Sequence, residues 1–200
     1  MSISIKTNEE GCTYADYLKF DDDKRREIID GVIYLMSSPS DEHQRIQERL
    51  SRISGTYLSN HKCQVRTAVF DVRLNPCSEN SDKIIVQPDV MIICDEKKLE
   101  NGKRCDGAPE VVFEILSETN QENDLVKKKK VYREFGVKEY FVVNPMIEEV
   151  IEYKFIEKSE EIIYTKMEEI IHIKEIGFKI RLSDIFGHTE RFEPAILKEI

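Results

Sequence analysis

The sequence predicts an α/β (α+β) fold in which a mixed β-sheet is flanked by helices. Three features indicate this class. Helical periodicity occurs at 41–59 and again at 121–135, and short apolar runs of strand character lie between the two segments. Another strand, 139–145, follows the second helix. From 148 to 182 the chain changes to short alternating segments, which are typical of an antiparallel meander, so helices and strands are expected to build one mixed sheet.

Length and composition indicate a globular protein of ordinary domain size. The chain has 200 residues, 40% of them hydrophobic and 34% charged, which is enough apolar material for a core. No repeat, linker or low-complexity segment divides it, so we expect one domain over residues 1–200. No apolar run approaches the ~20 residues of a transmembrane helix, and the N-terminus lacks the apolar stretch of a signal peptide. We therefore expect a cytoplasmic protein with no membrane partner.

The charge balance is unfavourable for a nucleic-acid binder but does not exclude one. The net charge is −9, whereas affinity for nucleic acids comes largely from cations that meet phosphates. The charge is unevenly distributed, since residues 127–130 are four lysines while 21–23 and 147–170 are acidic. A local basic patch on an acidic protein is therefore compatible with the sequence.

The cysteines show no sign of a metal site or a disulfide framework. They are five in number and scattered, at Cys12, Cys63, Cys77, Cys94 and Cys105. They form no Cys-x-x-Cys pair and no zinc-ligand spacing with histidine, and a catalytic cysteine has no supporting signature. We expect free thiols in a reducing compartment.

The N-terminal half predicts a short helix, a hairpin and a long helix. Residues 13–16 (Thr-Tyr-Ala-Asp) resemble a capping box. Segment 26–35 predicts two strands around a two-residue Asp-Gly turn. Ser40 is a suitable helix cap, and the helix at 41–59 has an apolar stripe that also includes His43.

The middle of the chain predicts strands and one further helix. The strands are expected at 65–74, 84–94 and 110–116. A loop over 95–108 separates the last two. The helix at 121–135 is expected to end at Gly136.

Two of the predicted strands carry an acidic residue among aliphatic neighbours. These are Asp89, within Gln-Pro-Asp-Val-Met-Ile-Ile, and Glu114, within Val-Val-Phe-Glu-Ile-Leu. A carboxylate in a buried strand is costly unless a cation meets it. Pro88 argues for an edge, a bulge or a bend beside Asp89. Two converging carboxylates repel unless a divalent cation lies between them, and oxygen ligands with water suit Mg²⁺. Ordinary buried salt bridges or strand-end caps are the alternative interpretation.

A lysine supplies a second candidate cation. On a helical wheel of the segment after the Glu114 strand, Leu125, Tyr132 and Phe135 lie on one side and Lys128 falls in the middle of that apolar arc. A core-facing lysine there has a short route to Glu114. The alternative is a snorkelling side chain with a solvated ammonium.

Several ordered motifs add a family resemblance. They are Glu27-Ile-Ile-Asp-Gly, Pro39-Ser40 followed by His43, Gln87-Pro-Asp-Val, Gly107-Ala-Pro-Glu-Val-Val-Phe-Glu-Ile-Leu-Ser, Asp124-x-x-x-Lys128-x-x-x-Tyr132 and Gly136-Val-x-Glu-Tyr-Phe-Val-Val-x-Pro. In this order they resemble the Uma-type family of putative restriction endonucleases. The match runs from about 13 to 186, where Leu-Ser-Asp-Ile-Phe resembles the closing motif. It implies a restriction-endonuclease-like fold of the PD-(D/E)xK superfamily with its core at about 13–186, and the alternating segments add C-terminal antiparallel strands.

The same resemblance implies a Mg²⁺-dependent endonuclease that hydrolyses DNA phosphodiester bonds. Asp89 and Glu114 match the positions that hold Mg²⁺, for which Mn²⁺ can substitute. The carbonyl of Ile115 matches a further ligand. Glu27 matches an early acidic position that completes the metal site through water.

The lysine and histidine of the family pattern need separate comment. The general motif places its lysine two residues after the second acid, where this chain has Leu116. The family pattern takes the lysine from the following helix instead, and Lys128 matches it. His43 matches a recurrent histidine, for which we expect core packing.

Two other function classes stay open at this point. One is a retired nuclease that serves as a nucleic-acid or protein binding module, which the acidic composition favours. The other is a metal-dependent hydrolase of small phosphoesters. The apolar edges of the C-terminal strands are compatible with a homodimer.

Overall fold

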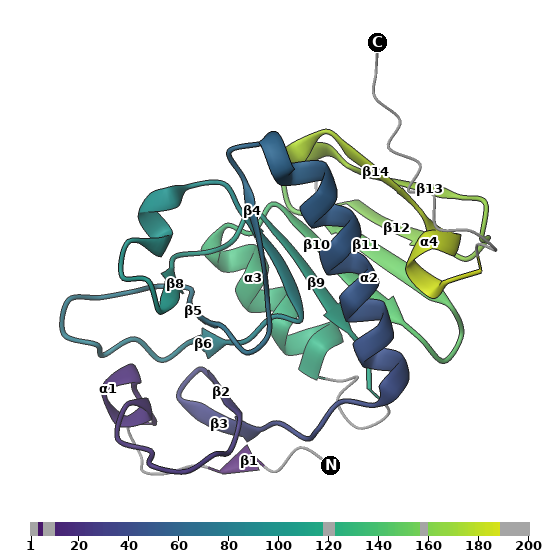
Figure 1. Ribbon diagram of the computed structural model, residues 1–200. Helices are drawn as coiled ribbons and strands as arrows, with labels where there is room; N and C mark the ends of the chain where they lie inside the picture. The colour runs from purple at the N-terminus through teal and green to yellow at the C-terminus, as the bar shows by residue number, and fades with distance from the viewer. Residues whose placement is uncertain (1–3, 6–10, 118–122, 157–159, 189–200) are drawn as a thin grey trace.

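The computed structural model describes residues 4–5, 11–117, 123–156 and 160–188 (Figure 1). Its centre is a six-stranded mixed sheet in the order β12-β11-β10-β9-β7-β4. The strands are β4 (Gln64–Thr67), β7 (Val90–Ile93), β9 (Val111–Ile115), β10 (Glu139–Asn144), β11 (Glu149–Lys154) and β12 (Glu160–Tyr164). β9 and β10 run parallel, and the other neighbours are antiparallel.

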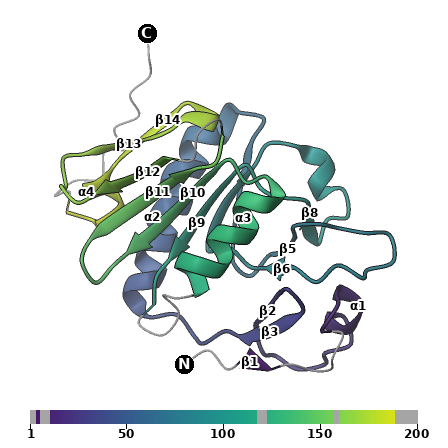
Figure 2. The ribbon, with the colours of Figure 1, turned by 180° about the vertical axis from the view of Figure 1, so that it is seen from behind.

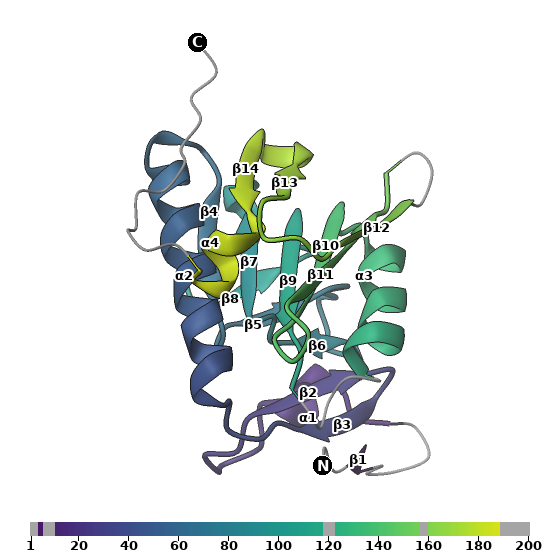
Figure 3. The same ribbon diagram turned by 90° about the vertical axis from the view of Figure 1, so that its right-hand side faces the viewer.

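Two helices cover the opposite faces of this sheet (Figure 3). Helix α2 (Asp41–Tyr57) begins at Ser40, whose hydroxyl accepts the N–H of His43 at 3.2 Å. Its stripe packs on one face of the sheet, against residues such as Val90 and Phe113. On the other face lies α3 (Lys129–Phe135), which a π-helical turn, η3 (Asn123–Lys128), precedes (Figure 2). The helix at 121–135 is thus confirmed over its described part, since 118–122 lie outside the described residues.

A second sheet packs beside one end of the first, in the order β1-β3-β2-β6-β5-β8. Its strands are β1 (Ser4–Ile5), β2 (Arg26–Ile29), β3 (Val32–Leu35), β5 (Asp71–Arg73), β6 (Ile85–Val86) and β8 (Arg104–Asp106). The predicted β2–β3 hairpin is confirmed, and its turn residues Asp30 and Gly31 have φ of 51° and 76°, as a tight hairpin turn requires. The predicted capping box is also confirmed, because Thr13 and Asp16 cap α1 (Tyr14–Tyr17) reciprocally.

The remaining elements complete the C-terminal part. The predicted meander is confirmed for β11 and β12, which extend the central sheet. Strands β13 (Ile170–Ile173) and β14 (Phe178–Arg181) form a separate hairpin, and α4 (Leu182–Phe186) follows it close to α2. Short 3₁₀ turns occupy Leu58–Asn60, Glu96–Leu99 and Lys174–Ile176. Within the described ranges no helix has the length and apolarity needed to cross a bilayer.

Two of the predicted strands were wrong in the same way. The segments 65–74 and 84–94 are not continuous strands, because each passes from one sheet to the other, as β4 to β5 and as β6 to β7. The crossings lie side by side, and Ala68 donates its N–H to the carbonyl of Asp89 at 3.2 Å. Pro88 cannot donate to a ladder, and the bend predicted there separates two sheets. The predicted loop 95–108 was also incomplete, since it contains a 3₁₀ turn and β8.

The expectation of free thiols was wrong for one pair of cysteines. Cys63 and Cys94 form a disulfide, while Cys12, Cys77 and Cys105 are free. Gln64 pairs with Ile93 in the β4–β7 ladder, so the two cysteines lie opposite each other just beyond it. This proximity arises from strand register across 31 residues of sequence, which the spacing of cysteines does not reveal.

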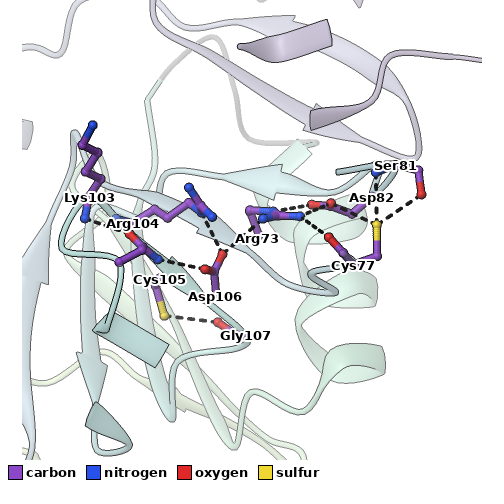
Figure 4. A network of polar contacts seen from close by, with 10 residues as sticks. Arg73, Cys77, Ser81, Asp82, Lys103, Arg104, Cys105, Asp106 and Gly107 are labelled. Atoms are coloured by element: carbon purple, nitrogen blue, oxygen red, sulfur yellow. Dashed lines mark hydrogen bonds and ion pairs between the residues drawn. The ribbon is translucent and has the colours of Figure 1, made fainter. Parts of the chain in front are cut away.

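A buried ion network fastens the second sheet to its surrounding loops (Figure 4). Arg73 pairs with Asp82 at 2.8 Å through Nε and donates to the carbonyl of Cys77 at 3.1 Å. It also lies 3.5 Å from Asp106, to which Arg104 donates at 2.8 Å. Burial raises the pKa of Asp82, but the hydrogen bonds and positive charge of Arg73, together with further hydrogen bonds, hold that pKa below its usual value.

Candidate active site

The segment that joins the two sheets also carries the first predicted acid. Gln87, Pro88 and Asp89 connect β6 to β7, and all three are buried. Val90 pairs with Phe113, so the next opposed positions, one step beyond the ladder, are Asp89 and Glu114. The two predicted metal ligands therefore lie at the same end of neighbouring antiparallel strands.

The carboxylate of Asp89 is held by one of its two oxygens. Its Oδ2 accepts the N–H of Ile115 at 2.8 Å and lies 3.1 Å from Nε2 of His43. Its Oδ1 makes no hydrogen bond to any residue in the described ranges, and no lysine or arginine there pairs with this carboxylate. Asp89 is thus fixed in orientation while one of its oxygens remains available to a ligand.

The second acid meets the predicted lysine. Glu114 Oε1 lies 3.0 Å from Nζ of Lys128 and accepts the hydroxyl of Tyr132 at 2.6 Å. Lys128 is 1% exposed, which confirms its core-facing position and excludes the snorkelling alternative. The buried salt bridge considered from the sequence does form, and Lys128 is the partner of Glu114.

The third acid reaches the same ammonium from the other sheet. Glu27 projects from β2, and its Oε1 lies 2.9 Å from Nζ of Lys128. The same oxygen accepts the N–H of Gln87 at 2.8 Å. Lys128 is therefore placed between Glu27 and Glu114, and Glu27 also binds the main chain of Gln87.

Electrostatics favour a further cation at this place. Two buried carboxylates, Glu27 and Glu114, meet the ammonium of Lys128, and a third buried carboxylate, Asp89, lies at the strand position opposite Glu114. Burial raises the pKa of Tyr132 well above its usual value, and the neighbouring Glu114 carboxylate raises it further, so this hydroxyl stays protonated and donates. The cluster holds more acid than base, and a divalent cation would balance the excess.

The available donors fit Mg²⁺ rather than a metal that prefers nitrogen or sulfur. Asp89 Oδ1, the Glu114 carboxylate and the Ile115 carbonyl are hard oxygen ligands, and Mg²⁺ usually takes only one or two protein carboxylates with water in its other positions. In the described part of the chain, no three or more His, Cys, Asp or Glu side chains are grouped as a metal site.

Sequence reasoning missed several polar partners of these residues. His43 was expected to serve core packing, but it contacts Asp89. Gln87 was noted only as part of a motif, although its main chain binds Glu27. Tyr132 follows Lys128 by four residues, a spacing that places both on one helix face and could have indicated their shared contact with Glu114. Leu116, at the usual lysine position, is buried in the apolar cluster beneath α3.

Comparisons with known proteins agree with this arrangement of elements. A crystal structure of a putative nuclease belonging to DUF820 from Anabaena variabilis superposes with a TM-score of 0.71, at 15% identity, over 88% of this chain and 97% of that chain. At this identity the likeness concerns the fold, and it confirms the predicted nuclease-like mixed sheet flanked by helices. A search of curated proteins gave no match. The model of Uma2, described as putative restriction endonuclease, matches residues 13–176. This match covers most of the chain, which therefore belongs to the Uma2 family.

Proposed function

We propose that the protein is a Mg²⁺-dependent endonuclease that hydrolyses DNA phosphodiester bonds. The observation that carries the proposal is the buried Lys128 between Glu27 and Glu114, at the strand end where Oδ1 of Asp89 has no hydrogen bond to the described residues. Carboxylates that could hold a divalent cation beside an ammonium suit a reaction at a phosphate, because the two positive charges would stabilise the negative charge that develops there.

Each residue has a distinct part in this proposal. Asp89, Glu114 and the Ile115 carbonyl would hold the metal ion, which supplies charge neutralisation and a water of lowered pKa when bound. Lys128 would orient the attacking water or stabilise the developing charge through Nζ. Glu27 holds Lys128 in place through their ion pair. In this proposal Glu27 also binds a water molecule of the metal ion.

The closest competing function is a binding module that has kept the fold without catalysis. The net charge of −9 favours it, because an acidic surface weakens contact with DNA phosphates. A hydrolase of small phosphoesters is the other competitor. It predicts cleavage of a chromogenic phosphodiester by a protein that has no affinity for DNA.

Nicking of supercoiled plasmid in Mg²⁺ separates these functions. We expect wild-type protein to nick the plasmid, and Asp89→Ala and Lys128→Ala to lose that activity. Lys62→Ala is the matched control, since Lys62 is exposed just beyond α2. Equal nicking by all four proteins would point to a contaminating nuclease and refute the proposal. Mn²⁺ is expected to replace Mg²⁺.

The proposal also covers the number of domains and the oligomeric state. We infer that residues 1–200 form one cytoplasmic domain and that two copies associate. Edge strand β12 and its surroundings leave apolar side chains exposed, among them Ile163 and Ile156, and a second copy could cover them. Light scattering on purified protein should give twice the monomer mass, and Ile163→Lys should reduce it to that of a monomer.

A further inference from the structure

Helix α2 contacts Asp89 through two side chains that lie one turn apart. His43 Nε2 lies 3.1 Å from Oδ2 of the Asp89 carboxylate. Gln47, four residues along the helix, donates to the main-chain carbonyl of Asp89 at 2.9 Å. Spacing by four places both side chains on one helix face, so the first turns of α2 hold this residue by its side chain and by its backbone.

The His43 ring makes no other polar contact with the described part of the protein. The residue is 8% exposed, and its Nδ1 is buried without a hydrogen-bond partner among the described residues. A buried polar atom left in this state is costly. A leucine or methionine would serve the core without that cost, so packing alone does not account for a histidine here.

The geometry of the contact determines what it does to Asp89. Nε2 of His43 and the N–H of Ile115 both meet Oδ2. Because an ionised carboxylate oxygen only accepts, Nε2 is the donor in the first contact. Two donors on one oxygen fix the rotation of the carboxylate and leave Oδ1 as the oxygen without a hydrogen bond to the described residues. Outer partners of this kind orient a metal ligand.

We propose that His43 is a positioning residue that holds Oδ2 of Asp89 so that Oδ1 faces a divalent cation. This inference rests on the proposed function, because it presupposes that a cation binds at Asp89. His43 touches neither the substrate nor the cation in this role. It reaches Asp89 from α2, on one face of the central sheet, whereas Lys128 reaches Glu114 beside α3 on the other face (Figure 3). The site is thereby assembled from both helical layers.

Two amide variants test the hydrogen bond separately from the packing. In His43→Gln the side-chain amide nitrogen lies near the former Nε2 position and can still donate to Asp89. In His43→Asn the shorter amide lies near the former Nδ1 position and cannot reach. Both variants lose the ring. Titration calorimetry with Mn²⁺ alone is the measurement, with thermal unfolding of each apo-protein alongside it.

We expect His43→Asn to bind Mn²⁺ about 10–100-fold more weakly than wild type, and His43→Gln to recover most of that loss. His43→Leu, a second variant without a donor, should resemble His43→Asn and replaces it if the asparagine variant does not fold. The Mg²⁺ concentration for half-maximal nicking should rise in the same variants, with less change in the rate at saturating Mg²⁺.

Three results would overturn the inference. If His43→Asn or His43→Leu binds Mn²⁺ as tightly as wild type, the contact does not position Asp89. If His43→Gln is as weak as His43→Asn, the lost ring rather than the hydrogen bond is responsible. If wild-type protein binds no Mn²⁺, the proposed function fails and this inference fails with it. The first two results presuppose that the wild type binds Mn²⁺, so they refute the role of His43 without refuting the proposed function.

Discussion

Glu27 and Glu114 belong to different sheets and share one ammonium, which lies 2.9 Å from the first and 3.0 Å from the second. That ammonium belongs to Lys128, whose side chain is almost fully buried. Both carboxylates are almost fully buried, so the charge of each is balanced by the lysine together with a hydrogen bond, from the N–H of Gln87 to Glu27 and from Tyr132 to Glu114. The contact therefore stabilises the junction of the two sheets and the candidate active site at once.

Removal of the shared cation should affect stability as well as activity. Lys128→Met keeps most of the side-chain volume but leaves two buried carboxylates without their ammonium, so we expect a loss of about 3–5 kcal/mol in the free energy of unfolding, together with loss of nicking. Urea denaturation measures the first effect. The double variant Lys128→Met/Glu27→Gln should regain part of the stability and none of the activity. An unchanged unfolding midpoint in Lys128→Met would contradict the shared contact.

Metal binding should be visible as thermal stabilisation. A ligand that binds only the folded state at 100 times its Kd stabilises by about 2.7 kcal/mol, so Mg²⁺ at high excess should raise the Tm of wild-type protein. Asp89→Asn keeps the size of the side chain and removes its charge, and its Tm should not respond to Mg²⁺. Glu48→Gln, an exposed change on α2, is the control. An equal response from all three proteins would mean that the ion binds elsewhere.

The buried positions of Asp89, Glu114 and Lys128 could be predicted because their signals are local. An acid in an apolar run, as at Asp89 and Glu114, is visible in a few residues of sequence. Lys128 could be placed in the core because a helical wheel needs only its neighbours. The turn at Asp30 and the cap at Ser40 are equally local signals, and both were predicted correctly.

Contacts between distant segments could not be predicted in this way. His43 and Asp89 are 46 residues apart, and the apolar pattern of α2 gives no information about which distant residue its histidine contacts. The change of sheet at Pro88 was hidden because apolar residues continue on both sides of it, and β6 and β7 are both buried. A continuous run of apolar residues does not indicate that its first part, β6, and its second part, β7, belong to different sheets.

The buried ion pair of Arg73 and Asp82 should make stability depend on acid pH. Burial raises the pKa of Asp82, but the hydrogen bonds and positive charge of Arg73, together with further hydrogen bonds to the carboxylate, outweigh burial and lower that pKa in the folded state. A lowered folded pKa contributes stability above the unfolded value of about 3.9, and this contribution is lost as pH falls through the folded pKa. Asp82→Asn should therefore be less stable than wild type at pH 7, by about 3–5 kcal/mol.

Denaturation at several pH values checks this prediction. The difference between Asp82→Asn and wild type should shrink steadily as the pH is lowered below about 4. Asp95→Asn is a suitable control, because Asp95 lies on the surface and caps a 3₁₀ turn. A difference that stays constant down to pH 2 would show that the carboxylate charge is not the cause.

The Cys63–Cys94 disulfide should respond to reduction, with a measurable effect on stability. It closes 31 residues of sequence, and a disulfide of that span typically stabilises by about 2–4 kcal/mol. Non-reduced protein that is unfolded and alkylated should gain label at Cys12, Cys77 and Cys105, as mass spectrometry can determine. After reduction all five cysteines should be labelled, and the free energy of unfolding should fall.

Five labels without reduction would show that the bond does not form under the conditions of expression, as is usual in a reducing compartment. The double variant Cys63→Ala/Cys94→Ala should then be no less stable than the reduced wild type.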